Sequence, residues 1–270
     1  MNISRLFSAV LSCLALALPA AAQDGVGTPL QGDLLTGWQQ ADGRRVAAVR
    51  LRMAPGWKTY WRSPGDAGIP PEFDWSGSNN LRDVQITWPA PKVFDQGGVS
   101  SIGYAREVIL PLTITPRRPG APVTLDTSID LGVCSDVCVP QTLHLSAVLD
   151  GPENKPTPAI AAALAARPYS GAEAGLKSAR CSLRPTARGL EIETRLSLPS
   201  AGGKETVVIE PGNPNMWMSE TVSQRSGNTL VASGEMIAEN GTALALDRSA
   251  IRITVIGKNH AVEVTGCTSG

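Results

Sequence analysis

The sequence predicts an all-β protein. Short stretches in which apolar and polar residues alternate recur along the 270 residues, and a period of two is typical of β-strands. Glycine and proline, at 27 and 21 residues, are frequent between these stretches, as expected of turns. A polar run near the middle of the chain divides the stretches into two groups. These observations together predict two tandem β-sandwich domains of immunoglobulin-like architecture.

The alternating stretches are distributed over both halves of the chain. Before the polar run they are Arg45 to Met53, Val84 to Trp88, Glu107 to Thr115, Val123 to Leu131 and Thr142 to Leu149. After it they are Leu190 to Leu198, Glu205 to Ile209, Thr229 to Ala232, Ile251 to Ile256 and Ala261 to Thr265. Each stretch is long enough for one strand with one apolar face. No sequence repeat relates the two groups.

The first 22 residues have the features of a cleaved secretory signal peptide. Arg5 supplies a positive charge, residues 6–18 are almost all apolar, and residues 20–22 are alanines that fit a cleavage site. The apolar stretch is too short for a comfortable membrane span of about 20 residues. We therefore expect an exported, periplasmic protein that is soluble after cleavage. Cys13 lies in a weak lipoprotein-like motif, but most of the apolar stretch follows it, so lipidation is not expected.

A polar run that contains three prolines, from Asp150 to Pro158, marks the expected domain boundary. The alanine-rich segment that follows, Ala159 to Arg167, predicts one short helix that ends before Pro168. The expected organisation is a signal peptide at 1–22, a first β-sandwich at 23–150, a linker with a short helix at 151–170 and a second β-sandwich at 171–270.

Charge and motif content argue against several classes of protein. Lysine plus arginine equals aspartate plus glutamate, at 24 each, so no net field attracts nucleic acid. The sequence has two histidines, and it lacks a Gly-x-Ser-x-Gly motif, zinc-ligand spacing and a phosphate-binding glycine loop. A hydrolase or a nucleotide-dependent enzyme is therefore not expected, and neither a metal nor an organic cofactor is predicted.

Four cysteines remain after removal of the signal peptide, and an exported protein would keep them oxidised. Four cysteines allow three pairings. We expect Cys134 to pair with Cys138, and Cys181 to pair with Cys267. In the chain-entropy model the longer ring stabilises the fold by about 4.5 kcal/mol and the short ring by about 2 kcal/mol. The long-range bond is therefore expected to be structural and the short-range bond to be redox-active.

The pair Cys134 and Cys138 allows three interpretations. The predicted one is thiol–disulfide exchange on an exposed hairpin, where a partner's sulfur could approach; Asp136 between the cysteines would disfavour a thiolate. A second is an ordinary structural hairpin disulfide. A third is copper(I) binding in a copper-tolerance role, because two soft sulfurs suit that ion, although no third ligand lies nearby in the sequence.

The segment from Pro89 to Gly98 is too interrupted by proline and glycine for a strand. Phe94 is its single large apolar side chain, and on a loop an aromatic ring could shield a disulfide.

Several motifs in the first half resemble the periplasmic N-terminal domain of the thiol:disulfide interchange protein DsbD, and especially its ScsB-like branch. The motifs that carry this resemblance are Pro55 to Gly68, Phe73 to Trp75, Trp88 to Pro91, Gly103 and Tyr104, Val108 to Pro111, and Gly132 to Pro140. They follow the order of the family and cover most of the first expected domain. The short spacing of the two cysteines matches the ScsB-like branch, whereas DsbD itself has a longer gap.

The resemblance implies an immunoglobulin-like fold and specific roles. Cys138 would form the mixed disulfide with partners, and Cys134 would resolve it. Phe94 corresponds to the aromatic residue of a cap loop over the disulfide, and Tyr60 corresponds to a tyrosine near the active site.

The resemblance also implies partners. Electrons would come from a membrane-embedded thiol reductase domain, which we expect on another chain because this one ends at Gly270. They would pass to periplasmic thioredoxin-fold proteins, such as disulfide isomerases or cytochrome c biogenesis factors. If the protein is catalytic, it would be a protein-disulfide reductase.

Overall fold

The computed structural model describes residues 28–66, 68–96, 98–151, 155–213, 215–238 and 246–270. The expected signal peptide and Cys13 lie outside the described residues. Among the described residues, nearly all regular structure is β-strand, with one short helix, so the prediction of an all-β fold is confirmed. The described residues contain no helix that is long and apolar enough to cross a membrane.

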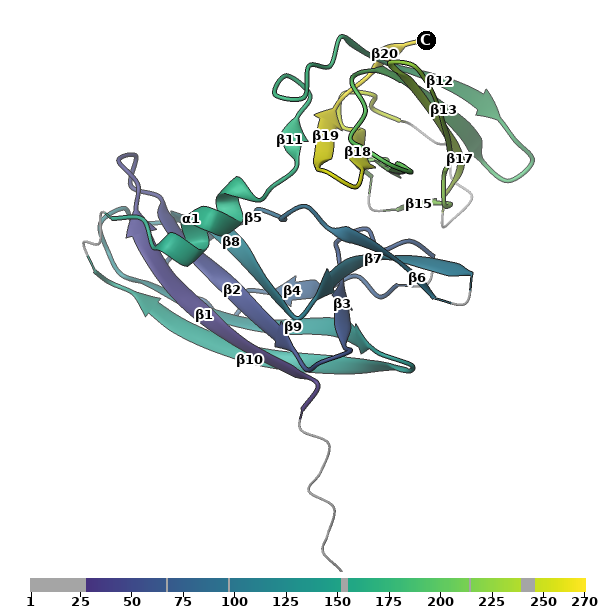
Figure 1. Cartoon of the computed structure of the whole chain (residues 1–270). Coiled ribbons are helices and arrows are strands. Elements are labelled where there is room, and N and C mark those ends of the chain that lie inside the picture. The colour runs from purple at the N-terminus through teal and green to yellow at the C-terminus, as the bar shows by residue number, and fades with distance from the viewer. Residues whose placement is uncertain (1–27, 67, 97, 152–154, 214, 239–245) are drawn as a thin grey trace, which may run out of the picture.

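The strands up to residue 149 form two sheets, which together we call the first sandwich (Figure 1). One sheet has the order β1-β2-β8-β5, and the other has the order β10-β9-β3-β7-β6 with β4 paired to β9. The strand bounds are β1 Leu30–Gln39, β2 Arg45–Met53, β3 Lys58–Tyr60, β4 Glu72–Asp74, β5 Leu81–Ile86, β6 Lys92–Gln96, β7 Val99–Ala105, β8 Glu107–Pro116, β9 Val123–Cys134 and β10 Cys138–Leu149.

The core of the first sandwich lies between its two sheets because alternate side chains of each strand face inward. In β9, for example, every second residue from Val123 to Val133 is buried. Trp61, which follows β3, is fully buried in this core. The next residue after Val133 is Cys134, so its side chain projects from the opposite, outer face of the sheet.

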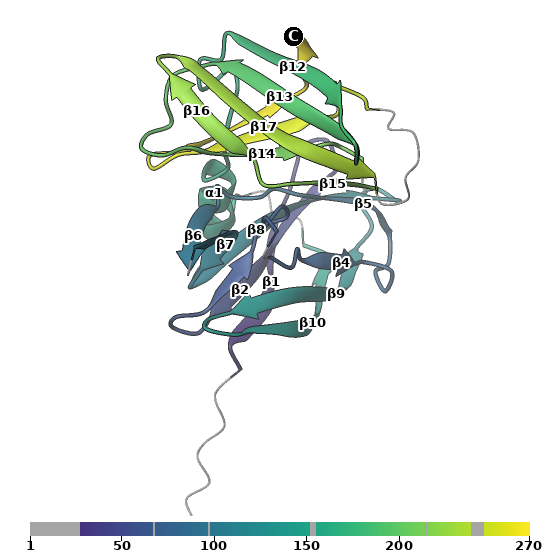
Figure 2. The same cartoon turned by 90° about the vertical axis from the view of Figure 1, so that its right-hand side faces the viewer.

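The second sandwich comprises the strands from residue 169 onward and has the same plan of a smaller and a larger sheet (Figure 2). The sheet orders are β11-β19-β18-β14 and β15-β17-β13-β12-β20, with β16 paired to β17. The strand bounds are β11 Tyr169–Ser170, β12 Ser178–Pro185, β13 Leu190–Ser197, β14 Thr206–Glu210, β15 Met216–Met218, β16 Val222–Ser226, β17 Thr229–Ala238, β18 Arg252–Ile256, β19 Ala261–Thr265 and β20 Thr268–Ser269.

The helix α1, Pro158–Ala165, connects the two sandwiches and packs on the first. Proline at its first position suits a helix start, because the missing N–H has no partner there. Ile160 is fully buried against Val46 and Ala48 of β2, and the Ala166 carbonyl accepts a hydrogen bond from the Ala90 N–H at 2.8 Å. The linker is therefore docked on the outer face of a sheet.

The expected strands all occur; Arg45–Met53 and Ala261–Thr265 have the expected bounds, and the others have shifted ends. Two differences matter for function. The strands β9 and β10 extend to the cysteines themselves, so the hairpin loop is shorter than the alternation indicated. The expectation that residues 89–98 contain no strand was wrong, because Lys92–Gln96 forms β6 by pairing with β7 between the prolines and the glycines.

Candidate functional site

The short-range disulfide closes the β9–β10 hairpin. Cys134 is the last residue of β9, Cys138 is the first of β10, and the two lie directly opposite each other in the register with Cα atoms 4.1 Å apart. The Ser135 N–H donates to the Val137 carbonyl at 3.1 Å within the connecting turn. The hairpin thus brings the two sulfurs together without any long-range rearrangement of the chain.

The two halves of this disulfide differ in accessibility. Cys134 is 1% exposed, whereas Cys138 and the preceding residues Asp136 and Val137 are exposed. A thiolate from another protein can therefore approach the Cys138 side of the bond. Thiol–disulfide exchange requires such access along the S–S axis, with the far sulfur as the leaving group.

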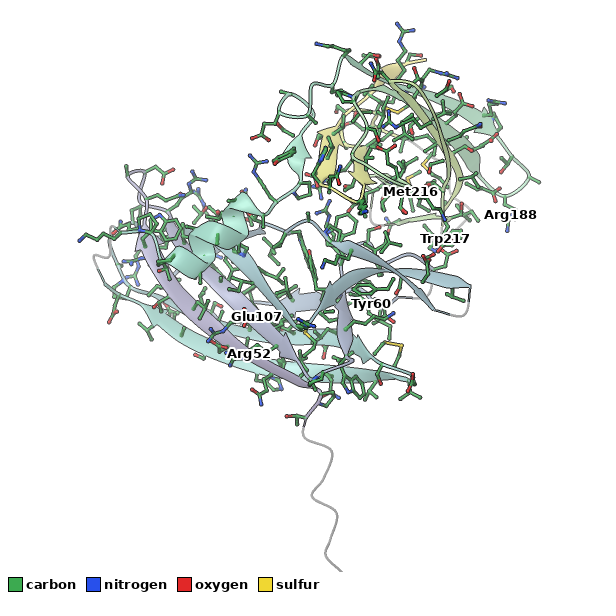
Figure 3. All side chains as sticks on the ribbon, viewed as in Figure 1. Arg52, Tyr60, Glu107, Arg188, Met216 and Trp217 are labelled. Atoms are coloured by element: carbon green, nitrogen blue, oxygen red, sulfur yellow. A yellow bond between two sulfur atoms is a disulfide. The ribbon has the colours of Figure 1, made fainter. Side chains whose placement is uncertain are left out.

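Tyr60 contacts both sulfurs of the disulfide. Its Oη lies 2.8 Å from the Cys134 Sγ and 3.2 Å from the Cys138 Sγ, and the side chain comes from β3, beside β9 (Figure 3). A phenol O–H can donate to a sulfur, and it donates more strongly to a thiolate than to a disulfide. Burial raises the pKa of Tyr60 above its ordinary value, so the phenol keeps its proton at neutral pH.

Tyr60 fits against the sheet because residue 132 is a glycine. A Cβ at Gly132 would lie 2.9 Å from the Tyr60 Cε2 and 3.0 Å from the Ile69 Cβ. On another side of the ring, a Cβ at Gly68 would lie 3.0 Å from the Tyr60 Cδ1. The ring is therefore held between β9 and the segment that follows β3, and a side chain at Gly132 would displace it.

Lys58 is a buried basic residue beside the cysteine pair. It lies opposite Cys134 in the β3–β9 register, and its Nζ donates to the Ser101 Oγ at 3.0 Å. Its Nζ also lies 5.2 Å from the centre of the Phe94 ring, a cation–π contact. Burial lowers the pKa of Lys58.

Two segments cover the outer face of the sheet at the site. Cys134, Tyr60 and Lys58 belong to that face, yet all three are buried. Gly68 and Ile69 lie over Tyr60 and Gly132, and Phe94 of β6 contacts Lys58. Phe94 therefore reaches the site from a paired strand, and its role as a shield of the sulfurs stays a prediction.

The long-range disulfide occupies a different environment. Cys181 of β12 is fully buried in the core of the second sandwich, and Cys267 lies just before β20 and packs against the same core. The two residues are 86 apart in sequence. This bond joins two parts of one core and has no exposed face comparable to that of Cys138.

Few side chains near the hairpin disulfide can act as metal ligands. In the part of the chain that the structure describes, no three or more histidine, cysteine, aspartate or glutamate side chains are grouped as metal ligands would be. The two sulfurs at the hairpin are the soft ligands of the site.

Sequence reasoning placed Cys134 and Cys138 directly, and Tyr60 only through the resemblance. It missed Lys58, Gly68 and Gly132, whose importance depends on strand register and close contacts. A lysine in a run of aromatic residues, Trp57-Lys58-Thr59-Tyr60-Trp61, was the available signal for a buried charge.

Two comparisons with known proteins concern the family of the first sandwich and the fold of the chain. Residues 31–150 match the family model described as "Thiol:disulfide interchange protein DsbD, N-terminal". The fold is similar to the crystal structure of the N-terminal periplasmic domain of ScsB from Proteus mirabilis, with a TM-score of 0.66 and 23% sequence identity. That match covers 90% of this chain and 95% of the other. Among curated proteins no match was found. The resemblance drawn from the sequence is therefore confirmed.

Proposed function

We propose that this chain, whose residues 31–150 match the DsbD N-terminal family, exchanges thiols and disulfides with other proteins through Cys134 and Cys138. The observation that carries the proposal is the asymmetry of the disulfide. One half is exposed, the other is buried, and a phenol lies within hydrogen-bonding distance of both sulfurs.

The asymmetry supports different roles for the two cysteines. A donor thiolate attacks the Cys138 Sγ and forms a mixed disulfide, the Cys134–Cys138 bond breaks, and its electron pair stays on the Cys134 Sγ. A second thiolate of the donor then attacks the donor sulfur of the mixed disulfide and releases Cys138. The donor becomes a disulfide, and this protein gains two electrons and two protons as a dithiol. No organic cofactor takes part.

Tyr60 supports the step in which charge develops. The leaving thiolate on Cys134 forms in a buried place, and an unpaired buried charge is costly. The Tyr60 O–H is 2.8 Å from that sulfur and can donate to it. The hydrogen bond stabilises the thiolate more than the disulfide, so it favours bond cleavage.

The proposed partners are proteins with paired thiols. By analogy with the family, electrons come from a membrane-embedded thiol reductase domain and pass to oxidised thioredoxin-fold proteins or disulfide isomerases in the periplasm. The similar domain of ScsB is periplasmic, and the signal-like N-terminal sequence of this chain agrees with the same compartment. When the chain donates electrons, the Cys138 thiolate attacks the acceptor's disulfide, and Cys134 resolves the complex.

The test is capture of the mixed disulfide in cells. A Cys134→Ser variant keeps the exposed Cys138 and lacks the resolving thiol, so we expect it to accumulate covalent complexes with partner proteins. Cys138→Ser is the matched control, because its remaining thiol is buried. The proposal fails if thiol trapping finds the native pair always oxidised and no complex forms with either variant.

If the same two sulfurs instead bind copper(I), a binding measurement should give a different result. In that case the reduced protein would hold one Cu(I) ion against a competing chelator and lose it on Cys138→Ser. We expect instead that the chelator removes the ion, because the described residues group no third ligand with the pair.

A further inference from the structure

An arginine two residues after Tyr60 joins the two sandwiches. The Arg62 Nε donates to the Glu210 Oε1 at 2.9 Å, and its Nη2 donates to the Glu210 Oε2 at 2.8 Å and to the Glu263 Oε2 at 2.6 Å. Arg62 belongs to the first sandwich, whereas Glu210 ends β14 and Glu263 lies in β19 of the second. A single guanidinium therefore binds carboxylates from two strands of the other domain.

Three features of Arg62 restrict the geometry of its contact with the second sandwich. The Arg62 side chain is 14% exposed, its bond to Glu210 is bidentate, and its guanidinium carbon lies 4.3 Å from the centre of the buried Trp61 ring. Arg252 lies within 4.0 Å of both carboxylates, so two positive and two negative charges balance. We call Arg62, Glu210, Glu263 and Arg252 the interdomain clamp.

Residues 62–66 and 68–70, as far as the structure describes them, lie between the clamp and the redox pair. The first part faces the second sandwich, because residues 63–65 line a cavity of about 320 Å³ together with residues 204–209 and 218–223. The last part covers the site, because Gly68 lies against the Tyr60 ring and Ile69 lies over Gly132. Within the first part, the Pro64 carbonyl accepts a hydrogen bond from the Ile102 N–H of β7 at 2.9 Å. The same segment thus contacts the second sandwich and the Tyr60 ring.

We infer that the second sandwich is a working part of the redox site: the interdomain clamp fixes residues 62–66, and with them the position of Gly68 and Ile69 over Tyr60 and Gly132, and thereby keeps the phenol on the two sulfurs. Arg62, Glu210 and Glu263 are positioning residues that act through Tyr60. This inference rests on the proposed function only in that the disulfide must be reducible. It gives the second sandwich a role that its own residues do not otherwise indicate.

The inference concerns one chemical step that a small dithiol can perform in place of a partner protein. A thiolate of dithiothreitol attacks the Cys138 Sγ, the Cys134–Cys138 bond breaks, and the electron pair goes to the Cys134 Sγ. The second dithiothreitol thiol closes its own ring and releases Cys138 as a thiolate. The two thiolates take up two protons, and dithiothreitol is oxidised by two electrons. A displaced Tyr60 would leave the Cys134 thiolate less stabilised and slow this step.

The test neutralises the clamp from the second sandwich and measures reduction of the full chain by dithiothreitol. We expect Glu210→Gln combined with Glu263→Gln to slow reduction about fivefold, since the hydrogen bond from Tyr60 to the thiolate is weakened. In the Tyr60→Phe background the same pair of changes should alter the rate less than about twofold, because the hydrogen bond is already absent. Alkylation of Cys134 and Cys138, followed by mass spectrometry, reports this disulfide separately from Cys181–Cys267.

The control changes a different ion pair of the second sandwich. Glu235 binds Arg188 and lies outside the clamp, so Glu235→Gln should leave the rate unchanged. Equal slowing in the Tyr60 and Phe backgrounds would overturn the inference, because the carboxylates would then act by some route other than Tyr60. No slowing in either background would overturn it as well.

A second measurement keeps the inference testable if the double variant folds poorly. In a Cys138→Ser protein, Cys134 is the free thiol of the pair, and its thiolate absorbance reports its pKa. Arg62→Lys keeps the charge and loses the bidentate geometry, so we expect a higher pKa of Cys134 than with Arg62. An unchanged pKa would contradict the inference. Absence of captured partners in cells would instead count against the proposed function and would leave both measurements intact.

Discussion

The two disulfides of this protein differ in position, in ring size and in surroundings. Cys181 and Cys267 are 86 residues apart and pack in the core of one sandwich, whereas Cys134 and Cys138 are four apart and close a hairpin. Cross-linking distant residues removes more freedom from the unfolded chain than cross-linking neighbours. The long-range bond therefore contributes more to stability, and the hairpin bond can open with little loss of structure.

The surroundings of the two bonds differ as much as their ring sizes. The hairpin bond has an exposed half at Cys138 and a phenol on both sulfurs. Cys181 is enclosed by apolar side chains of the second core. A reactive disulfide thus needs access on one side and stabilisation of the leaving thiolate on the other, and the first sandwich supplies both.

The largest expected effect is loss of exchange on removal of the accessible sulfur. Cys138→Ser should abolish formation of mixed disulfides and reduction of partner proteins, because Cys134 is 1% exposed. Cys267→Ser should retain exchange, slowed by no more than the roughly fivefold expected from loss of the interdomain clamp. Gel-based trapping of alkylated thiols measures both. Comparable loss of exchange in the two variants would show that the comparison between the disulfides is wrong.

For the free energy of unfolding, we expect removal of the long-range disulfide to have the larger effect. Replacing Cys181 and Cys267 with alanine should lower the free energy of unfolding of the second sandwich by about 4.5 kcal/mol, whereas removing the hairpin bond should cost the first sandwich about 2 kcal/mol. Hydrogen exchange followed by mass spectrometry separates the two sandwiches. A larger loss from the hairpin bond would contradict the assignment of the long-range bond as the structural one.

Most strands could be predicted from the alternation of apolar and polar residues. Strands that lack this alternation could not. In β3 all of Lys58, Thr59 and Tyr60 are buried, so burial does not alternate in this strand. In β1 two glycines replace apolar side chains, and Gly37 is required because a Cβ there would lie 2.4 Å from the Val46 carbonyl oxygen. Such strands are determined by their neighbours in space, which local patterns do not contain.

The candidate site likewise contains residues that the sequence predicts and residues that it does not. Cysteine spacing gave Cys134 and Cys138, because sulfur chemistry is carried by residue type. Spacing could not give Arg62, whose partners Glu210 and Glu263 lie 148 and 201 residues away. Nor could it give the contact of Gly132 with Tyr60. These contacts depend on how the sheets and the two sandwiches pack.

A smaller effect is expected at Tyr60. Tyr60→Phe keeps the ring against Gly132 and removes the donor, so reduction by dithiothreitol should slow about tenfold, the value of a weak charge-assisted hydrogen bond. Burial raises the pKa of Tyr60, so the difference between the two proteins should persist as the pH rises to about 10, the ordinary pKa of tyrosine. Stopped-flow rates across this range measure it. Rates that converge below about pH 9 would show that the phenol is not the donor.

The smallest expected effect is at Phe94, which tests how far the hairpin bond is shielded. The ring contacts Lys58 through a cation–π interaction worth about 0.5 to 1 kcal/mol, so Phe94→Ala should speed reduction by a small thiol about threefold. Phe94→Leu is the matched control, because it keeps apolar volume and loses the π face. If the site opens through loss of the cation–π contact, leucine should behave like alanine. If bulk alone shields the sulfurs, leucine should keep the native rate, and an unchanged rate in both variants would place the shielding with Gly68 and Ile69 instead.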